Sequence, residues 1–244
     1  YRTDVDLAGE AAIRSWWRKW YTIIERCNSI ITFGSVADIS TADKQLILRE
    51  AYVQRANAYF WLIRKYDNIW LNLEPTSIDN LEDRIYEPAN QEEVYQLIVA
   101  DLDSAIAYFD GNWSVSPGRY GLGAALFLRT DVALWQNDFE TASKLAEQLI
   151  NESSYKLIAP NEIFTKDGRN NSKETIYALQ LDEFANGGGS AHRLPLVFTT
   201  QYRKVPGTVT ATDFGGYGWA RVAPNEHLIS LYDSKYDLRW DAWW

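Results

Sequence analysis

The sequence holds no methionine, one cysteine and two histidines among its 244 residues. Because a complete translation product begins with methionine, we expect an internal portion of a larger protein. The single Cys27 excludes an internal disulfide framework, and its place in the apolar run IIERCNSII predicts a buried, inert thiol. His192 and His227 show no CxxC or HExxH spacing, so neither a zinc site nor an activated nucleophile is indicated. We therefore expect no metal, no cofactor and no catalytic cysteine or histidine.

Positive charge and long apolar runs are also scarce. The chain carries 24 Lys and Arg against 33 Asp and Glu, a formal net charge of −9. Binding to nucleic-acid phosphates or to anionic lipid depends on clustered basic residues, so this balance disfavours both. No apolar run approaches the length that crosses a bilayer, and no signal-peptide core is visible at the start. We expect that any targeting segment lies outside this sequence.

Aromatic residues, in contrast, are abundant, with 11 Trp and 15 Tyr. Trp16 and Trp17 lie in a helical pattern, where core packing is the default, yet they project about 100° apart and need not share one environment. The stretch FGGYGWA (214–220) places Phe214, Tyr217 and Trp219 among glycines, which weaken both helices and strands. From the residues alone, these aromatics either plug a core or are displayed to a ligand, and the two interpretations are evenly matched.

Apolar residues recur at steps of three and four through the first two thirds of the sequence, which predicts α-helices. We expect helices over residues 11–33, 40–67, 91–109, 122–136 and 139–152, with Ser40 or Thr41 as the cap of the second and a long loop over 68–90. Only a short turn separates the last two helices, which predicts an αα-hairpin. Stacked hairpins of this kind would form a tetratricopeptide-like superhelix.

After Ser153 the pattern changes to short segments between turn-rich stretches. They predict a few short strands and one short helix in PNEHLISLYDSKY. GGGS at 187–190 lacks the Lys-Ser/Thr of a phosphate loop and is typical of a linker. The predicted fold is mainly α: a helical-hairpin scaffold over 1–153, with a loop-rich, ligand-binding part over 154–244 packed on it as one compact unit.

Six segments, taken in order, resemble the SusD/RagB family of outer-membrane nutrient-binding lipoproteins of Bacteroidetes. They are WWRKWYTIIERCNSII, REAYVQRANAYFWLIRKYDNIWL, EEVYQLIVADLDSAIAYF, GRYGLGAALFLRTDVALWQNDFETASKLAEQLI, SKETIYALQ and GGYGWARVAPNEHLISLYDSKYDLR. The chain departs from the family pattern at Asp67 and Trp70, which stand where the family has Gly and Pro, so that turn is expected to differ. The segments cover nearly the whole chain, and the family would normally continue beyond its end.

The resemblance implies a protein that binds and does not catalyse. Family members hold tetratricopeptide-like helix pairs and a shallow site, commonly for glycans. They sit on the outer surface of the cell outer membrane through an N-terminal lipid anchor, which is not present in this chain, and cap a TonB-dependent, SusC-like transporter. We therefore expect a cell-surface protein that binds an oligosaccharide and delivers it to such a partner. No role with nucleic acid is expected.

The resemblance also directs the choice of site residues, because FGGYGWA falls where relatives carry loops near their ligand. We expect Tyr217 and Trp219 to stack on sugar rings. Further candidates are Trp16, Trp17 and Phe214, with Asn225 as a hydrogen-bonding group. Three charged residues at family motif positions are interpreted as members of structural pairs: Asp101, Arg119 and Arg239.

Two other classes of function stay open from the sequence. A helical-repeat module could bind a peptide or protein on its concave face. A glycoside hydrolase would need two carboxylates held across a sugar, and the many acidic residues leave that possible, although most of them are expected in the first turns or on the solvated faces of helices.

Overall fold

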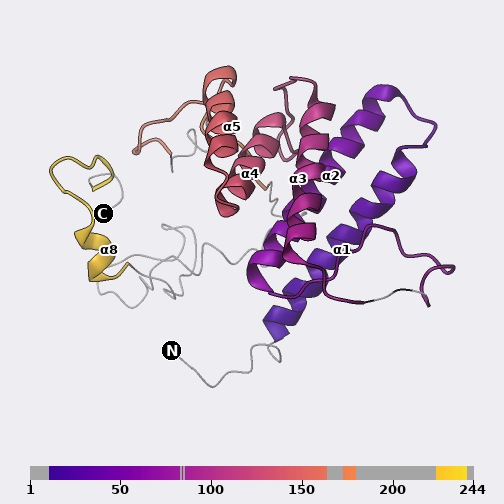
Figure 1. Cartoon of the computed structure of the whole chain (residues 1–244). Helices are drawn as coiled ribbons and strands as arrows, with labels where there is room; N and C mark the ends of the chain where they lie inside the picture. Colours follow the sequence, from indigo (N-terminus) through magenta and orange to yellow (C-terminus); the bar gives the residue numbers. More distant parts are fainter. Residues whose placement is uncertain (1–10, 83, 85, 164–172, 180–223, 241–244) are drawn as a thin grey trace, which may run out of the picture. The chain divides into compact units, whose positions relative to one another are not determined.

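A computed structural model describes residues 11–82, 84, 86–163, 173–179 and 224–240 (Figure 1). These residues contain six helices and no strand, which confirms the mainly α fold class. The helices are α1 (Ala11–Gly34), α2 (Thr41–Lys65), α3 (Gln91–Phe109), α4 (Leu122–Trp135), α5 (Phe139–Glu152) and α8 (Glu226–Ser230). The chain divides into two compact units, 1–155 and 156–244.

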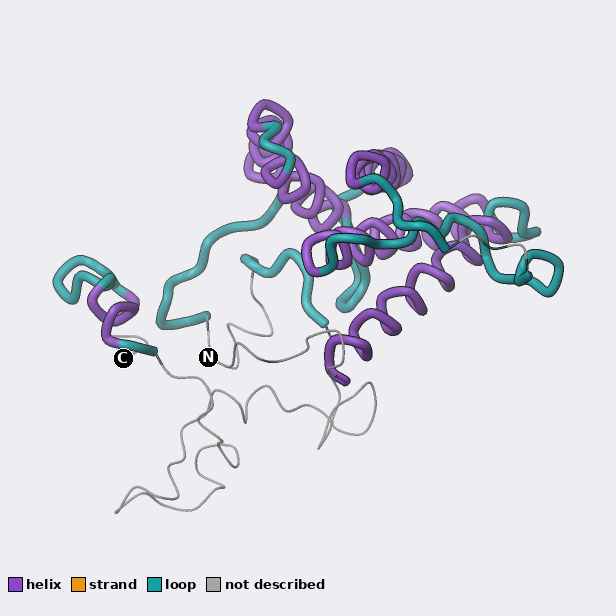
Figure 2. Tube along the Cα trace, turned by 60° about the horizontal axis from the view of Figure 1, so that its bottom comes forward, coloured by secondary structure: helices purple, strands orange, loops and turns teal. Residues whose placement is uncertain are grey.

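The first unit is a row of antiparallel helices, each in contact with the next along the chain (Figures 1 and 2). α4 and α5 form the predicted hairpin, with Asn137 in the left-handed region at φ 59° between them. In the second unit, residues 156–163 and 173–179 form no strand, although the sequence predicted a few short strands in this part of the chain. One backbone hydrogen bond joins these two segments, from Lys156 N to Lys173 O at 3.0 Å.

The helix ends follow local side-chain chemistry. Ser40 caps α2 by accepting a hydrogen bond from the Asp43 amide, so Ser40 and not Thr41 is the cap. Asn90 forms a capping box with Glu93 at the start of α3, and Asp138 caps α5 through the Thr141 amide. These caps provide the first amides of each helix with the partners that the helix itself lacks.

The core lies along α2, which packs between α1 and α3. Tyr59, Phe60 and Leu62 of α2 are fully buried together with Ile24 of α1 and Ile98 of α3. Because α2 has neighbours on both sides, its apolar residues are spread around the helix, as its buried set shows: Leu48, Ala51, Val53, Ala56, Ala58, Tyr59, Phe60, Leu62 and Ile63.

A buried polar network runs through this core. Arg55 of α2 donates two hydrogen bonds of 2.8 Å, from Nε and Nη2, to the two carboxylate oxygens of Asp101 on α3. Its Nη1 donates to Asn28 Oδ1 on α1 at 2.9 Å, and Asn28 Nδ2 donates to the carbonyl of Asn72 at 2.9 Å. The network therefore joins three helices to the loop between α2 and α3. Cys27 is buried beside it, as predicted, and burial raises the pKa of its thiol to about 12.

Candidate ligand-binding groove

A hollow of about 790 Å³ lies between α1 and the loop that joins α2 to α3. Four aromatic side chains line it: Trp17 and Tyr21 from α1, and Trp70 and Tyr86 from the loop. Their ring centroids form a continuous series, 4.8 Å from Trp17 to Tyr21, 6.0 Å from Tyr21 to Trp70 and 4.6 Å from Trp70 to Tyr86. We call these four side chains and the hollow beside them the aromatic groove.

Helix α1 supplies one wall of the aromatic groove through the four-residue spacing of two aromatic side chains. Trp17 and Tyr21 are four residues apart, so they lie on the same face of α1, one above the other. Trp17 also packs edge-on against Tyr66, with ring centroids 4.9 Å apart, and Tyr66 Oη donates a hydrogen bond of 2.8 Å to the Ile13 carbonyl. The α1 wall of the groove is therefore anchored at the end of α2.

Two tyrosine hydroxyls hold the loop in place. Tyr21 Oη accepts a hydrogen bond from the Trp70 amide and donates one to the Trp70 carbonyl, both at 2.8 Å. Tyr59 Oη makes the same pair with Asn72, at 2.8 Å from the amide and 2.7 Å to the carbonyl. Burial raises the pKa of Tyr21 to about 12 and raises that of Tyr59 as well, so both hydroxyls keep the proton that they donate.

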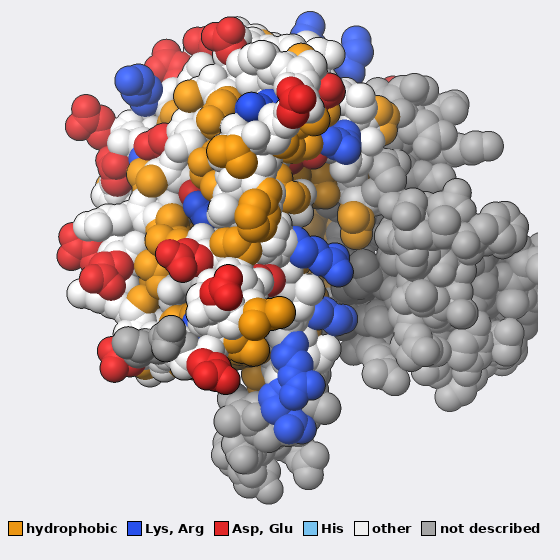
Figure 3. Space-filling view, turned by 90° about the vertical axis from the view of Figure 1, so that its right-hand side faces the viewer, with side chains coloured by type: hydrophobic (Ala, Val, Ile, Leu, Met, Phe, Trp, Pro, Cys, Tyr) orange, Lys and Arg blue, Asp and Glu red, His pale blue; other side chains and the backbone are white. Residues whose placement is uncertain are grey.

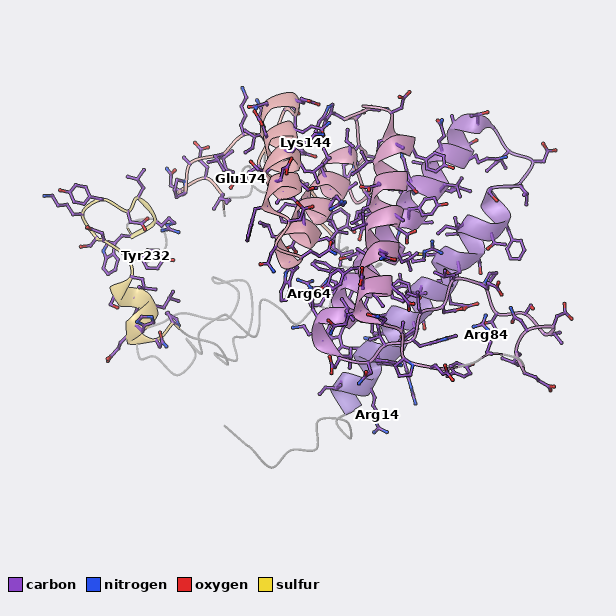
Figure 4. All side chains as sticks on the ribbon, viewed as in Figure 1. Arg14, Arg64, Arg84, Lys144, Glu174 and Tyr232 are labelled. Carbon is purple, nitrogen blue, oxygen red and sulfur yellow. The ribbon has the colours of Figure 1, made fainter. Side chains whose placement is uncertain are left out.

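A carboxylate and a guanidinium fix the outer part of the loop. Glu25 accepts hydrogen bonds from the Thr76 amide and from Asn72 Nδ2, the latter at 3.2 Å. Arg84 lies 3.9 Å from Glu25 Oε2, donates to the Glu74 carbonyl at 3.0 Å, and places its guanidinium 5.6 Å from the centre of the Trp70 ring. Figure 4 shows Arg84 on this loop. The Trp70 ring is thus supported by an arginine as well as by its backbone.

The far end of the loop returns beside its beginning. Trp70 and Pro88 form an isolated antiparallel bridge, and the Ala89 amide donates to the Ile69 carbonyl at 2.8 Å. This closure brings Tyr86, whose side chain is 65% exposed, beside Trp70. The groove therefore has three half-buried rings along its base and one exposed ring at its edge.

The predicted site residues fall in different places. Trp17 lines the aromatic groove. Trp16 is 56% exposed and belongs to another row, with ring centroids 6.3 Å from Trp16 to Trp20 and 5.8 Å from Trp20 to Trp61. Asn225 caps α8 by accepting a hydrogen bond of 2.8 Å from the Leu228 amide. The other three lie outside the described residues: Phe214, Tyr217 and Trp219.

Sequence reasoning did not single out Tyr21, Trp70 or Tyr86 as site residues. The signal for Tyr21 was its spacing of four from Trp17. The signal for Trp70 was its departure from the family pattern. A tryptophan at the position of the family's proline places a large flat ring on the turn. Nothing in the sequence indicated that Tyr86 would return to Trp70 across the loop.

Two of the charged motif residues are paired inside the helical scaffold as predicted, Asp101 with Arg55 and Arg119 with Glu50 at 2.7 Å. Arg239 was expected to pair inside the scaffold as well, but it pairs with Asp237, two residues away in the second unit, at 2.5 Å. In the part of the chain that the structure describes, no group of three or more His, Cys, Asp and Glu could hold a metal ion. None of the described helices is both long enough and apolar enough to span a bilayer.

The groove is suited to binding a flat, partly apolar molecule with polar edges. Aromatic rings offer a large contact area with few rotatable bonds, and the C–H faces of sugar rings stack on such surfaces. Polar groups lie close by on the same wall, among them Arg18, Thr22 and Arg26 of α1. The arrangement therefore supports recognition of a carbohydrate better than that of a purely apolar ligand.

Comparison with known proteins gives relatives in sequence. The chain is 29% identical over 182 residues to a SusD-like protein of Bacteroides ovatus, a match that covers 67% of this chain and 32% of that protein. It is 23% identical over 229 residues to the SusD-like protein P2 of Formosa agariphila, covering 91% of this chain and 43% of that protein. The chain thus spans between a third and a half of the length of these relatives. No family model matches it.

Solved structures show the same fold. A SusD superfamily protein of Bacteroides vulgatus matches with a TM-score of 0.62 and 25% identity, over 76% of this chain and 40% of that one. A structure with a xylogluco-oligosaccharide matches with a TM-score of 0.64 and 23% identity, over 76% and 39%. A laminarin-binding SusD-like protein matches with a TM-score of 0.58 and 23% identity, over 67% and 37%.

Proposed function

We propose that this chain, which is SusD-like in sequence and fold as its motifs predict, is part of a protein that binds an oligosaccharide at the aromatic groove. The observation that carries the proposal is the series Trp17, Tyr21, Trp70 and Tyr86 beside an open hollow of about 790 Å³. Two similar structures are named for a laminarin-binding protein and a xylogluco-oligosaccharide complex, which supports a glycan as the class of ligand.

The wider role follows the resemblance. We propose that the whole protein sits on the outer face of the outer membrane through a lipid anchor and passes the glycan to a TonB-dependent, SusC-like transporter. Tyr217, Trp219 and Phe214 remain proposed contributors to glycan binding, as do Trp16 and Asn225. The proposed role is binding without turnover. Two carboxylates line the groove, Glu25 and Glu87, and the hydrogen bonds of Glu25 are made to the loop that carries Trp70.

A binding screen tests this proposal. Soluble neutral and acidic oligosaccharides are titrated into the protein by calorimetry, and the same mixtures are analysed for released shorter products. We expect saturable binding of at least one glycan and no product. If no glycan in a broad panel binds while peptides do, the proposed ligand class is wrong. That result would favour a helical-repeat module that binds a peptide or protein. Release of products would instead favour a glycoside hydrolase.

The same titration assigns residues outside the described part of the chain. Trp219→Ala is expected to weaken binding of whichever glycan the screen identifies, because it removes a stacking ring. Unchanged affinity in this variant, with the glycan still bound by the parent protein, would exclude Trp219 from the site. The other proposed contributors, Tyr217, Phe214, Trp16 and Asn225, would then be tested in the same way.

A further inference from the structure

A stripe of arginines follows one side of α1, beside the aromatic groove. The helix carries four basic residues, Arg14, Arg18, Lys19 and Arg26, and one acidic residue, Glu25, on a chain whose formal net charge is −9. Arg14 and Arg18 lie about 40° apart around α1 and Arg18 and Arg26 about 80° apart, and all three line one hollow over about 18 Å of the helix. We call these three residues the basic stripe. All three are exposed.

The basic stripe is not used for folding in the way that six other arginines are. Six arginines in the described part of the chain form ion pairs with carboxylates: Arg55, Arg64, Arg84, Arg119, Arg129 and Arg239. Within the same described ranges, Arg14, Arg18 and Arg26 have no carboxylate at ion-pair distance.

Their position also does not stabilise the helix. The positive end of a helix dipole favours acidic residues in the first turn, and α1 has none there. Arg14 and Arg18 instead add positive charge to the first half of the helix. Within the described residues none of the three charges pairs with a carboxylate, and those of Arg14 and Arg18 do not stabilise the helix, so the stripe is available for a ligand.

The basic stripe and the aromatic groove are continuous. A second hollow of about 600 Å³ lies along the stripe, and it shares Arg18, Thr22 and Arg26 with the lining of the groove. Figure 3 shows basic and apolar side chains side by side on the face to the right of Figure 1, and Figure 4 shows Arg14 near the start of α1. A chain of sugars on the groove rings would therefore run within reach of guanidinium groups.

We infer that the oligosaccharide bound at the aromatic groove is acidic, with its carboxylate or sulfate groups held by Arg18 and Arg26. This inference rests on the proposed function and names its ligand class. Guanidinium groups bind such anions through paired N–H donors, and Arg retains its charge at any working pH. An anionic lipid surface is the less suitable partner, because the net charge of the chain is negative and the stripe borders hollows rather than a flat basic face.

The test compares ligands that differ in charge. The protein is titrated with an oligogalacturonate, its methyl-esterified form, a heparin-derived sulfated oligosaccharide and neutral oligosaccharides. The double variant Arg18→Gln/Arg26→Gln is compared with Lys144→Gln/Lys156→Gln, which removes two exposed charges that do not belong to α1. We expect at least one acidic oligosaccharide to bind, about tenfold more weakly in the α1 variant and unchanged in the control. Raised salt should weaken it further.

The outcomes separate this inference from the proposed function. Binding of a neutral or esterified glycan as tight as that of the acid overturns the inference and leaves the proposed function standing. Absence of all glycan binding overturns both. Binding to vesicles containing phosphatidylserine that is lost in the α1 variant, without acidic-glycan binding, overturns the inference in favour of a membrane surface. If thermal melting shows that the α1 variant is unfolded, Arg14→Gln/Arg18→Gln repeats the test, and full acidic-glycan affinity in that folded variant overturns it.

Discussion

Two aspartates on α3 show how strongly burial decides what a side chain contributes. Asp101 is buried and shares two 2.8 Å hydrogen bonds with Arg55, whereas Asp103, two residues on, makes a 3.0 Å pair with Arg129 and keeps 58% of its side chain exposed. Burial raises the pKa of the Asp101 carboxyl, and the guanidinium acts in the opposite direction by stabilising the charged form.

Replacing one member of the buried pair should therefore be costly. Asp101→Asn leaves the Arg55 charge buried without its partner, and we expect the free energy of unfolding to fall by about 3–5 kcal/mol. Asp103→Asn is the matched control, with an expected loss of at most about 1 kcal/mol. Urea denaturation measures both. Equal losses of unfolding free energy in the two variants would show that the buried Arg55–Asp101 pair matters no more for stability than the exposed Arg129–Asp103 pair.

The Tyr21 hydroxyl gives a prediction in alkaline solution. Its pKa is about 12 in the folded protein against an ordinary 10.0. Between these two values the unfolded chain loses the proton while the folded chain keeps it, so the stabilisation is present below pH 10 and is lost as the pH rises toward 12. Tyr21→Phe should be less stable than the parent at neutral pH and should lose less stability as the solution becomes alkaline. Denaturation series at pH 8 to 11 test this, and parallel curves for the two proteins would contradict it.

Some single residues of the groove could be predicted from sequence and others could not. Trp17 was named as a candidate together with Trp16, because the helical period places both residues on one helix but does not show which of them lies beside the loop. Trp70 and Tyr86 were not predicted, since their positions depend on loop closure: the Tyr21 and Tyr59 hydroxyls hold residues 49 and 13 positions away in the chain. Such long-range hydrogen bonds leave no local pattern in the sequence.

The helices themselves were predicted nearly to the residue. Apolar periodicity and local caps act within a few positions of each helix end, so the sequence contains the information directly. Asn90 is one such cap, with its side chain 3.0 Å from the Glu92 amide and its amide facing Glu93. The expected strands are the least predictable part, because short segments between turns lack a period long enough to distinguish strand from loop.

The cap of α3 can be tested on its own. Asn90→Ala removes the acceptor for the first amides of the helix, and we expect a loss of about 1 kcal/mol in the free energy of unfolding. Gln96→Ala, on the exposed face of the same helix, is the control and should change stability by less than about 0.5 kcal/mol. Because α3 packs on α2, the loss should appear in the main unfolding transition. A cap variant as stable as the parent would show that the helix start is held by packing instead.

On the scale of the whole molecule, aromatic rings and arginines lie together on one face of the helical scaffold, and a buried network holds that face in place. α1 contributes aromatic rings and arginines, the loop contributes Trp70 and Tyr86, and the buried Arg55 network ties that loop to the core through Asn28. The negative net charge correctly describes the chain as a whole but hides this local basic stripe. Net charge predicts general behaviour in solution, whereas a binding site depends on where the charges lie.

The central claim is that glycan binds at the aromatic groove, and its most direct test is the affinity of the Tyr86→Ala variant. Tyr86 is 65% exposed, so its removal should leave the fold intact, and Phe139→Ala removes an aromatic ring with 64% exposure from α5 as a matched control. With a glycan identified by the screen, we predict that Tyr86→Ala binds about tenfold more weakly and that Phe139→Ala binds like the parent. Equal affinity of Tyr86→Ala and the parent, with both proteins folded, would contradict the account.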